Sequence, residues 1–169
     1  GGTFDVSIIE IGDGVIEVLS TNGNTRLGGD DFDEIISDHI INAIQRDHHV
    51  DVRKDFAAMQ RIREAAETAK KELSTSETAN IILPYLTQQK GITVNAEYRL
   101  SRKRFNELTK ELVDRTEGPV RDALMDAGIA ASELSRVLLV GGSTRIPAVQ
   151  EAVRNVTGKE PFKGINPDE

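Results

Sequence analysis

A glycine-rich turn near the C-terminal end of the chain has residue types that can receive a ligand. Residues 137–140 read as a short buried strand, and Gly141, Gly142 and Ser143 follow it directly. Glycines carry no Cβ atom, so a ligand can approach the backbone closely, and the helix predicted after the turn offers free N–H groups and partial positive charge. Neither a Walker A loop nor a dinucleotide-binding glycine fingerprint occurs in the sequence. Spacing alone supports a ligand-binding turn and a plain strand-to-helix turn equally.

Four polar residues share one stripe of a helix predicted over about residues 57–73. Glu67, Lys70, Lys71 and Ser74 fall at positions i, i+3, i+4 and i+7. At ~100° per residue, this stripe lies roughly 120° from the apolar face, so it can line a cleft while the helix stays anchored. The alternative is an ordinary i,i+4 ion pair on a solvated face, and the pattern alone favours that alternative.

The N-terminal residues form a third candidate site. Gly1, Gly2 and Thr3 precede a predicted strand, and Asp5 lies on the same strand face as Thr3. Successive N–H groups and a hydroxyl can hold phosphate oxygens, and a carboxylate two residues on can hold Mg²⁺ or its waters. Taken alone, the segment is more simply a frayed terminus with an aspartate on a strand.

Composition narrows the classes of partner. The 169 residues are 38% hydrophobic and 29% charged, which is a globular balance. The net charge is −7 without a Lys/Arg cluster, so we expect no nucleic acid partner. No apolar run approaches the roughly 20 residues of a spanning helix, so we expect no membrane partner. The absence of cysteine excludes disulfides and thiolate metal sites.

The histidines do not predict a metal site. His39 lies on the apolar side of a predicted helix, which favours a core or boundary position. His48 and His49 are adjacent and therefore point in different directions, with no third ligand nearby in the sequence. The basic residues 102–104 are most simply a solvated first turn of a helix.

Periodicity predicts the elements of the N-terminal half. Alternating residues predict two strands around a hairpin turn at 12–14, with a second turn at 22–24. A helix begins at about residues 28–31 with an aspartate as its N-cap. Its apolar face comprises Phe32, Ile35, Ile36, His39, Ile40, Ala43 and Ile44.

The C-terminal half predicts strands at 81–83 and 92–100, followed by a helix capped by Ser101. Gly118 and Pro119 predict a kink or break in that helical stretch, and Gly128 predicts its end. Residues 136–140 predict an inner strand of an α/β sheet. The last predicted helix has Pro147 in its first turn, where the missing N–H costs little.

Taken together, these segments resemble the seventy-kilodalton heat-shock chaperones, and DnaK-like members most closely. The resemblance covers essentially the whole chain, and its specificity comes from the order and separation of the matching segments. These segments are residues 1–5, 21–23, 27–33, 58–61, 64–67, 70–74, 83–85, 139–147 and 166–169.

The resemblance implies one lobe of an actin-like ATPase, which holds ATP between two lobes. The chain is similar to the second lobe of that nucleotide-binding domain, and we expect it to be a fragment of a larger protein. Residues 1–29 and 112–169 would form a ribonuclease-H-like sheet subdomain carrying the phosphate and adenosine loops. Residues 30–111 would form an inserted α/β subdomain.

The resemblance also implies the role of each candidate residue. Gly1, Gly2 and Thr3 match the second phosphate-binding loop, with Thr3 near the γ-phosphate and Asp5 near Mg²⁺ and the attacking water. These two residues are the implied catalytic pair. The residues that match contacts with ribose or adenine are Glu67, Lys70, Lys71, Ser74, Gly141, Gly142, Ser143, Arg145 and Asp168, with Lys71 and Arg145 packing against the base.

The implied function is ATP binding by a molecular chaperone of the stress response. The family's first phosphate loop and catalytic lysine belong to the other lobe, so we expect ATP or ADP with Mg²⁺ to meet only a half-site here, without turnover. Implied partners are the first lobe, the peptide-binding domain, a nucleotide-exchange factor and a J-domain co-chaperone. The implied location is the bacterial cytoplasm or an organellar matrix or stroma.

Two alternatives remain open at the level of sequence. One is a sugar kinase on the same framework, although no substrate base can be located. The other is a non-catalytic docking module for an exchange partner, centred on residues 30–111. The sequence departs from the family pattern within residues 30–111. Lys71 replaces the arginine of many members, and its less planar cation predicts a looser grip on adenine. Phe56 replaces a proline, and the loop at 88–98 differs, so partner contacts of this subdomain are less well supported than nucleotide contacts.

Overall fold

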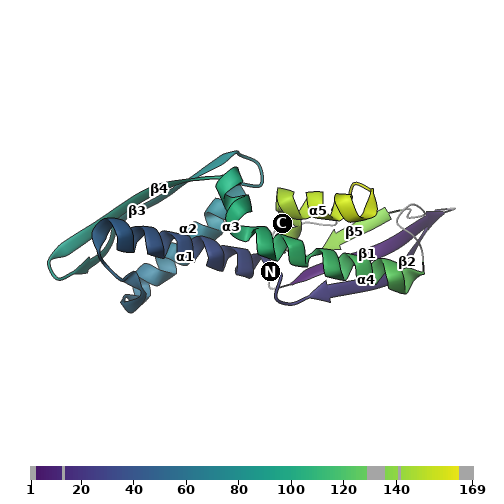
Figure 1. The fold of residues 1–169 in the computed structure, drawn as a ribbon, viewed down its shortest axis with the longest axis horizontal. Coiled ribbons are helices and arrows are strands. Elements are labelled where there is room, and N and C mark those ends of the chain that lie inside the picture. Colours follow the sequence, from purple (N-terminus) through teal and green to yellow (C-terminus); the bar gives the residue numbers. More distant parts are fainter. Residues whose placement is uncertain (1–2, 13, 129–135, 141, 164–169) are drawn as a thin grey trace. The chain divides into compact units, whose positions relative to one another are not determined.

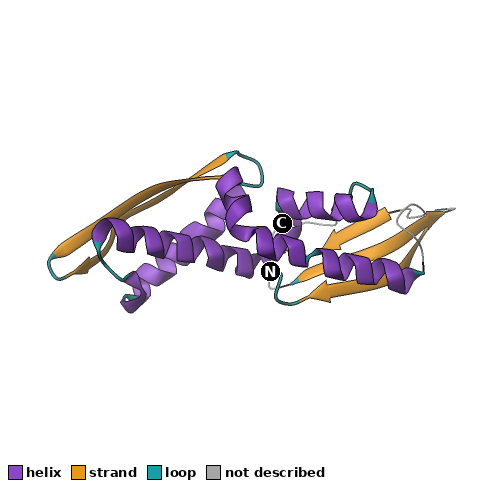
Figure 2. Ribbon diagram, viewed as in Figure 1, coloured by secondary structure: helices purple, strands orange, loops and turns teal. Residues whose placement is uncertain are grey.

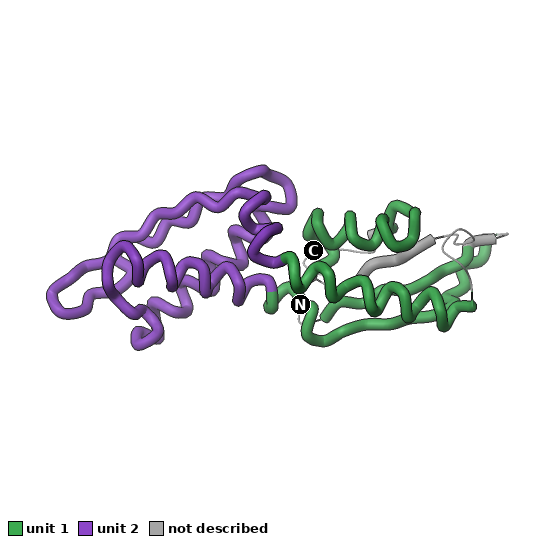
Figure 3. The backbone as a smooth tube through the Cα atoms, in the orientation of Figure 1, with its two compact units in different colours: residues 1–31, 110–169 green, residues 32–109 purple. Residues whose placement is uncertain are grey.

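The computed structural model describes residues 3–12, 14–128, 136–140 and 142–163. The chain divides into two compact units, residues 1–31 with 110–169 and residues 32–109 (Figure 3). Each unit contains both helices and strands (Figure 2), so the predicted mixed α/β class is confirmed. The actin-like identity of the sheet and the insertion of residues 30–111 remain predictions.

The described part of unit 1 is built on a four-stranded sheet. Strands β1 (Phe4–Gly12) and β2 (Val15–Asn24) pair antiparallel, and Gly14 adopts a φ of 76° in the turn between them. Strand β5 (Arg136–Val140) pairs antiparallel with β1 and parallel with β6 (Phe162–Lys163). The order β2-β1-β5-β6 places β5 inside the sheet, as its apolar run predicts (Figure 1).

The turn predicted at residues 22–24 is wrong. Strand β2 continues through these residues, which pair with the first residues of β1, and Gly23 lies opposite Asp5. The chain turns only afterwards, where the N–H groups of Arg26 and Leu27 donate to the Asn24 side chain and carbonyl. Cross-strand pairing with β1 thus outweighs the local turn preference of an Asn-Gly pair.

Helix α4 (Glu117–Ala127) packs against β1 and β2 and buries Val120 and Ala123. Gly128 follows it with a φ of 71°, which confirms the predicted helix end. The predicted break is also confirmed, although it falls at Thr116 rather than at the Gly-Pro pair. Proline is tolerated within the first turn of a new helix, so the helical stretch breaks just before that turn.

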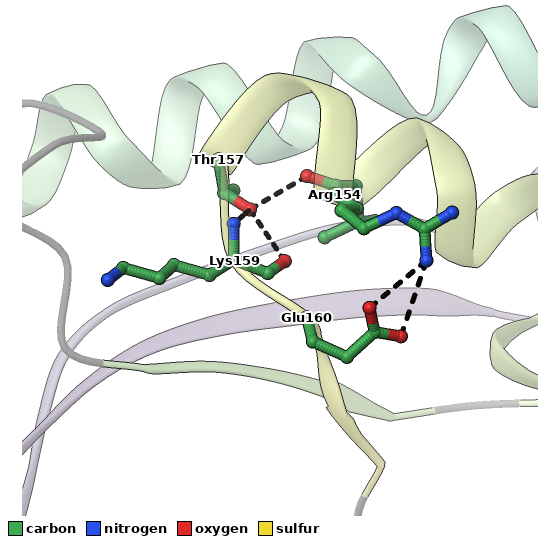
Figure 4. Close-up of polar contacts among 5 residues, drawn as sticks. Arg154, Thr157, Lys159 and Glu160 are labelled. Carbon is green, nitrogen blue, oxygen red and sulfur yellow. Dashed lines mark hydrogen bonds and ion pairs between the residues drawn. The ribbon is translucent and has the colours of Figure 1, made fainter.

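Helix α5 (Pro147–Thr157) begins with proline as predicted and ends in a hydrogen-bonded turn toward β6. The Thr157 hydroxyl donates to Val153 O at 2.8 Å and accepts from the Lys159 N–H at 3.2 Å (Figure 4). Arg154 pairs with Glu160 at 3.0 Å. These contacts satisfy groups that the helix end leaves without partners, and they fix the direction of the chain into the sheet.

Unit 2 combines helices with a long hairpin. Helix α1 (Gly29–His48) and helix α2 (Phe56–Glu72) are joined through a short 3₁₀ turn. Strands β3 (Thr78–Gln89) and β4 (Ile92–Ser101) pair antiparallel, and helix α3 (Arg102–Arg115) follows. Most of the predicted apolar face of α1 is fully buried, while Ile35 and His39 are half-buried.

The hairpin is longer than predicted and replaces the expected loop at residues 88–98. Lys90 and Gly91 both have positive φ, 52° and 78°, which is the geometry of a tight two-residue hairpin turn. At Pro84 and Tyr85 the strand bulges, and the Arg61 guanidinium donates to both carbonyls. Proline interrupts the periodic pattern there, which is why the sequence indicates only residues 81–83.

Two helix starts test the predicted caps. Ser101 accepts from the Arg104 N–H at 3.0 Å, which confirms its predicted capping role. For α1 the predicted aspartate N-cap is wrong, because the helix already begins at Gly29. Asp31 instead reaches back from the first turn and accepts from the Gly28 N–H at 2.9 Å. This is the contact that the third helical residue makes in a capping box.

Arg102 is not part of a solvated turn, contrary to the prediction for residues 102–104. Its Nε donates to Leu73 O at 2.9 Å, and its Nη1 pairs with Glu77 at 3.1 Å. Lys103 and Arg104 are exposed as predicted. Arg102 therefore caps the C-terminal end of α2, a contact between residues far apart in the sequence that no local pattern indicates.

We predict that unit 2 loses stability as the pH falls below 6.5 because of His39. Burial, with additional repulsion from Arg104 and Arg46, lowers the pKa of His39 below its ordinary value of 6.5. At a pH between the folded and unfolded pKa values of His39, the unfolded chain therefore binds a proton that the folded chain does not bind. The contribution is complete above pH 6.5 and is lost as the pH falls through the folded pKa.

Urea midpoints measured between pH 7.5 and 5.5 check this prediction. This pH range lies above the range in which carboxylates ordinarily titrate, so histidines dominate the change. The wild-type midpoint should fall toward acid pH, and the midpoint of His39→Gln should fall less. Parallel curves for the two proteins would contradict a role for this imidazole.

Candidate functional site

Two of the predicted site segments meet at one end of the sheet in unit 1. Asp5, near the start of β1, pairs with Val140 at the end of β5 on one side and with Gly23 near the end of β2 on the other. The glycine turn follows Val140 directly, and β1 contacts the 3₁₀ turn Gly142–Arg145. Antiparallel pairing therefore places the start of β1 beside the turn after β5.

Thr3 and Asp5 form a hydrogen-bonded pair at this sheet end. The Thr3 hydroxyl donates to Asp5 Oδ2 at 3.0 Å, and both residues are half-buried. The alternation of β1 buries Phe4 on one face and leaves these two polar side chains on the other, as predicted. The pair offers a carboxylate and a hydroxyl to a phosphate or to a hydrated cation.

The donor set fits a cation that is held mainly by other groups. Within the described residues, no cluster of three or more His, Cys, Asp or Glu could hold a metal ion. Mg²⁺ usually keeps several waters and binds through one or two carboxylates plus substrate phosphates. A single carboxylate on Asp5 therefore fits a hydrated Mg²⁺ that is held mainly by groups of a phosphate ligand.

The glycine turn continues as a 3₁₀ turn before α5. Ser143 is fully buried and Thr144 nearly so, while Arg145 is partly buried. The Gln150 side chain donates to Thr144 O at 2.8 Å, and the Ile146 N–H donates to Ser143 O. The turn is thus fixed by contacts with its own helix.

The polar stripe on α2 is present in unit 2. Lys71 pairs with Glu67 at 3.0 Å, and both side chains are about half exposed, at 49% and 52%. Ser74 lies just beyond the helix and donates to Lys71 O at 2.6 Å. The i,i+4 ion pair weighed as the simpler alternative is therefore confirmed, and it leaves one flank of α2 polar and accessible.

Lys70 differs from its neighbours in the stripe because it pairs with Asp33 of α1. The Lys70 Nζ lies 2.9 Å from Asp33 Oδ1, and the two side chains are only 10% and 15% exposed. No sequence signal joins these residues, which come from two different helices. The pair fixes the ammonium group beside a carboxylate rather than in open solvent.

Several predicted site residues lie outside the described residues. These are Gly1, Gly2, Gly141 and Asp168. Within unit 1 the structure brings together Thr3, Asp5 and the turn that leads to Arg145. Glu67, Lys70, Lys71 and Ser74 gather in unit 2. Ligand contacts for all of these residues remain predictions.

The fold and its polar groups define a mixed α/β protein with a Thr–Asp pair beside a glycine turn at one sheet end. None of its described helices has the length and apolar character needed to cross a membrane. The family model described as Hsp70 protein matches residues 1–169. The chain therefore belongs to the Hsp70 family, which confirms the resemblance drawn from its sequence motifs.

Proposed function

We propose that this chain is the second lobe of a chaperone ATPase and supplies half of its nucleotide site. The meeting of the Thr3–Asp5 pair with the glycine turn at one end of the sheet carries this proposal. Ligands of α/β proteins commonly bind outside strand ends, where such turns gather. Hsp70 family membership supports ATP as the ligand and protein folding as the process.

The proposed adenosine contacts follow the family resemblance residue by residue. Glu67, Lys70 and Ser74 would bond ribose or adenine, and Lys71 would pack against the base. The remaining proposed contacts are Gly141, Gly142 and Ser143 of the glycine turn, Arg145 against the base, and Asp168, which would close the adenosine pocket. The accessible polar flank of α2 supports the first set of contacts.

The phosphates and Mg²⁺ would lie at the start of β1. Gly1 and Gly2 would offer backbone N–H groups, and the Thr3 hydroxyl would lie near the γ-phosphate. The ion, when bound, would offset phosphate charge. The Asp5 carboxylate would orient a water molecule and would accept a proton or hydrogen bond from it at Oδ1 or Oδ2. The hydrogen bond from Thr3 would hold the carboxylate in place.

This half-site would not turn over by itself. Phosphoryl transfer depends on positioning and charge stabilisation from all sides, and losing even one stabilising donor can cost ~10²-fold in rate. In the family, a phosphate loop and a lysine come from the other lobe, and no segment of these 169 residues matches them. A first lobe, a peptide-binding domain and a J-domain co-chaperone are therefore the proposed partners in the reaction cycle.

An NMR titration with Mg-ADP and Mg-ATP tests the proposed site residue by residue. Shifts grouped at residues 67–74 and 143–145 would support a preformed adenosine half-site, and further shifts at Thr3 and Asp5 with Mg-ATP would support the phosphate site. Absence of shifts at millimolar nucleotide would contradict binding by this chain. Steady ATP hydrolysis well above a heat-killed control would contradict the lack of turnover.

A docking role for unit 2 is a second proposal, and exposed apolar side chains favour it. Phe56, Tyr85 and Ile82 are 83%, 79% and 61% exposed, although large apolar groups are usually covered. A nucleotide-exchange factor is the proposed partner. Pull-down by that factor should weaken for Phe56→Ala and Tyr85→Ala and stay unchanged for Met125→Ala, which alters an exposed side chain of unit 1.

The family assignment leaves the sugar kinase alternative without support.

A further inference from the structure

Gly23 occupies a strand position where backbone conformation does not require glycine. It lies within β2 opposite Asp5, and it is absent from the described residues with positive φ. Glycine within a strand weakens the strand, since it loses more backbone entropy and packs no side chain. A glycine in such a position often marks a close approach by another group.

The approaching group is the Asp5 carboxylate. A Cβ atom added to Gly23 would lie 2.2 Å from Asp5 Oδ1 and 3.2 Å from Asp5 Cγ. It would also lie 2.9 Å from the carbonyl oxygen of Phe4. Both oxygen distances are shorter than a carbon–oxygen contact can be, so the carboxylate and the local backbone would have to shift. The Asp5 side chain therefore lies across the strand, in the space that a side chain at residue 23 would fill.

Other glycines of the chain have different reasons for their identity. Gly14, Gly91, Gly128 and Gly158 have positive φ, and a Cβ on any of them would meet no atom within 4 Å. Gly118, in helix α4, also faces open space and has no positive φ. Gly118 thus supplies a matched position at which alanine introduces the same methyl group without a clash.

We propose that Gly23 is a positioning residue for Asp5. By leaving room for the carboxylate, it allows Asp5 to stay hydrogen-bonded to Thr3 at the sheet end where phosphate and Mg²⁺ are proposed to bind. The functional part of this inference rests on the proposed function, whereas the steric part stands on the ligand-free structure. A Cβ atom at residue 23 would overlap Asp5 Oδ1, so the carboxylate that accepts from the Thr3 hydroxyl would have to shift.

A double-mutant cycle in the ligand-free chain tests the steric part. Gly23→Ala should lower the thermal midpoint by on the order of 5 °C, as moderate overpacking does. In an Asp5→Ala background, which lacks the carboxylate, most of that loss should disappear; a remainder would reflect the Phe4 carbonyl. Gly118→Ala should leave the midpoint unchanged or raise it slightly.

Equal losses of thermal midpoint in the two backgrounds would overturn the proposal, because the need for glycine at residue 23 would then come from the backbone and not from the Asp5 carboxylate. Should Gly23→Ala fail to fold, recovery of the folded amide spectrum in the double variant would support the clash, and continued unfolding would overturn it.

Manganese with ADP tests the functional part, since the paramagnetic ion broadens nearby amide signals. Broadening at Thr3 and Asp5 in the wild type should persist in Gly118→Ala and fall at least several-fold in Gly23→Ala. Equal broadening in Gly23→Ala would overturn the positioning role. If the wild type shows no broadening, the proposed phosphate and metal site fails, and the thermal cycle still decides whether Gly23 makes room for Asp5.

Discussion

Replacing Phe105 by alanine is expected to destabilise unit 2 by about 3–5 kcal/mol, which is the usual cost of removing a large buried aromatic side chain. Phe105 on α3 is 1% exposed, and its ring lies 6.3 Å from the ring of the fully buried Phe32 on α1. The ring planes are tilted by 47°, and the centroid separation falls within the roughly 4.5–7 Å at which aromatic pairs interact. Loss of the Phe105 ring leaves a cavity between α1 and α3, two helices that are far apart in the sequence.

Urea unfolding followed by circular dichroism and by amide signals measures this effect. The signals of unit 2 should be lost at lower urea than in the wild type, and a fall of this size would consume much of a domain's total stability. Phe56→Ala is the matched control, because that ring is 83% exposed and its removal should change stability by less than about 0.5 kcal/mol. Similar midpoints for the two variants would contradict the assigned core.

The local elements could be predicted because their signals are local. The apolar face of α1, the Ser101 cap, the glycine after α4 and the proline at the start of α5 each depend on residues within one or two turns of the chain. Their geometry is set by backbone sterics and by hydrogen bonds over a few residues. The structure therefore confirms them with shifts of only a few positions.

Two of the errors occur where a distant partner decides the outcome. The Asn-Gly pair in residues 22–24 prefers a turn, but β1 supplies a complete ladder of backbone partners and holds it in a strand. Arg102 lies in a basic run that reads as surface, yet it caps the carbonyl of Leu73. Neither contact has a counterpart in local periodicity, so both require the tertiary fold.

The contacts of the candidate site also fall into local contacts, which the sequence predicts, and distant contacts, which it does not. Spacing alone placed Thr3 with Asp5 and aligned Glu67 with Lys71, and the structure shows both contacts. Spacing could not indicate that antiparallel pairing brings the start of β1 beside the turn after β5. Only the family resemblance linked these segments, because the pairing depends on strand order over more than a hundred residues.

The pair between Lys70 and Asp33 leads to the second prediction, in which Asp33→Ala destabilises unit 2 by about 3 kcal/mol. The two side chains are 10% and 15% exposed, and breaking a buried pair from one side leaves a charge with reduced compensation. Lys71→Ala is the matched control on the same helix. Its ion pair with Glu67 is half-exposed, and such i,i+4 pairs contribute about 0.3–0.5 kcal/mol.

A double variant separates the charge effect from lost packing. Asp33→Leu combined with Lys70→Met removes both charges and keeps apolar volume, so we expect it to be closer to the wild type than Asp33→Ala is. If the double variant is the least stable of the three, the pair itself is a net source of stability. If Asp33→Ala and Lys71→Ala are equally mild, the pair is effectively solvated and contributes little to the stability of unit 2. A large penalty for Asp33→Ala would instead mean that Asp33 fixes the position of Lys70 in the folded chain. At the proposed nucleotide site, such fixing would lower the entropy that the lysine loses on binding.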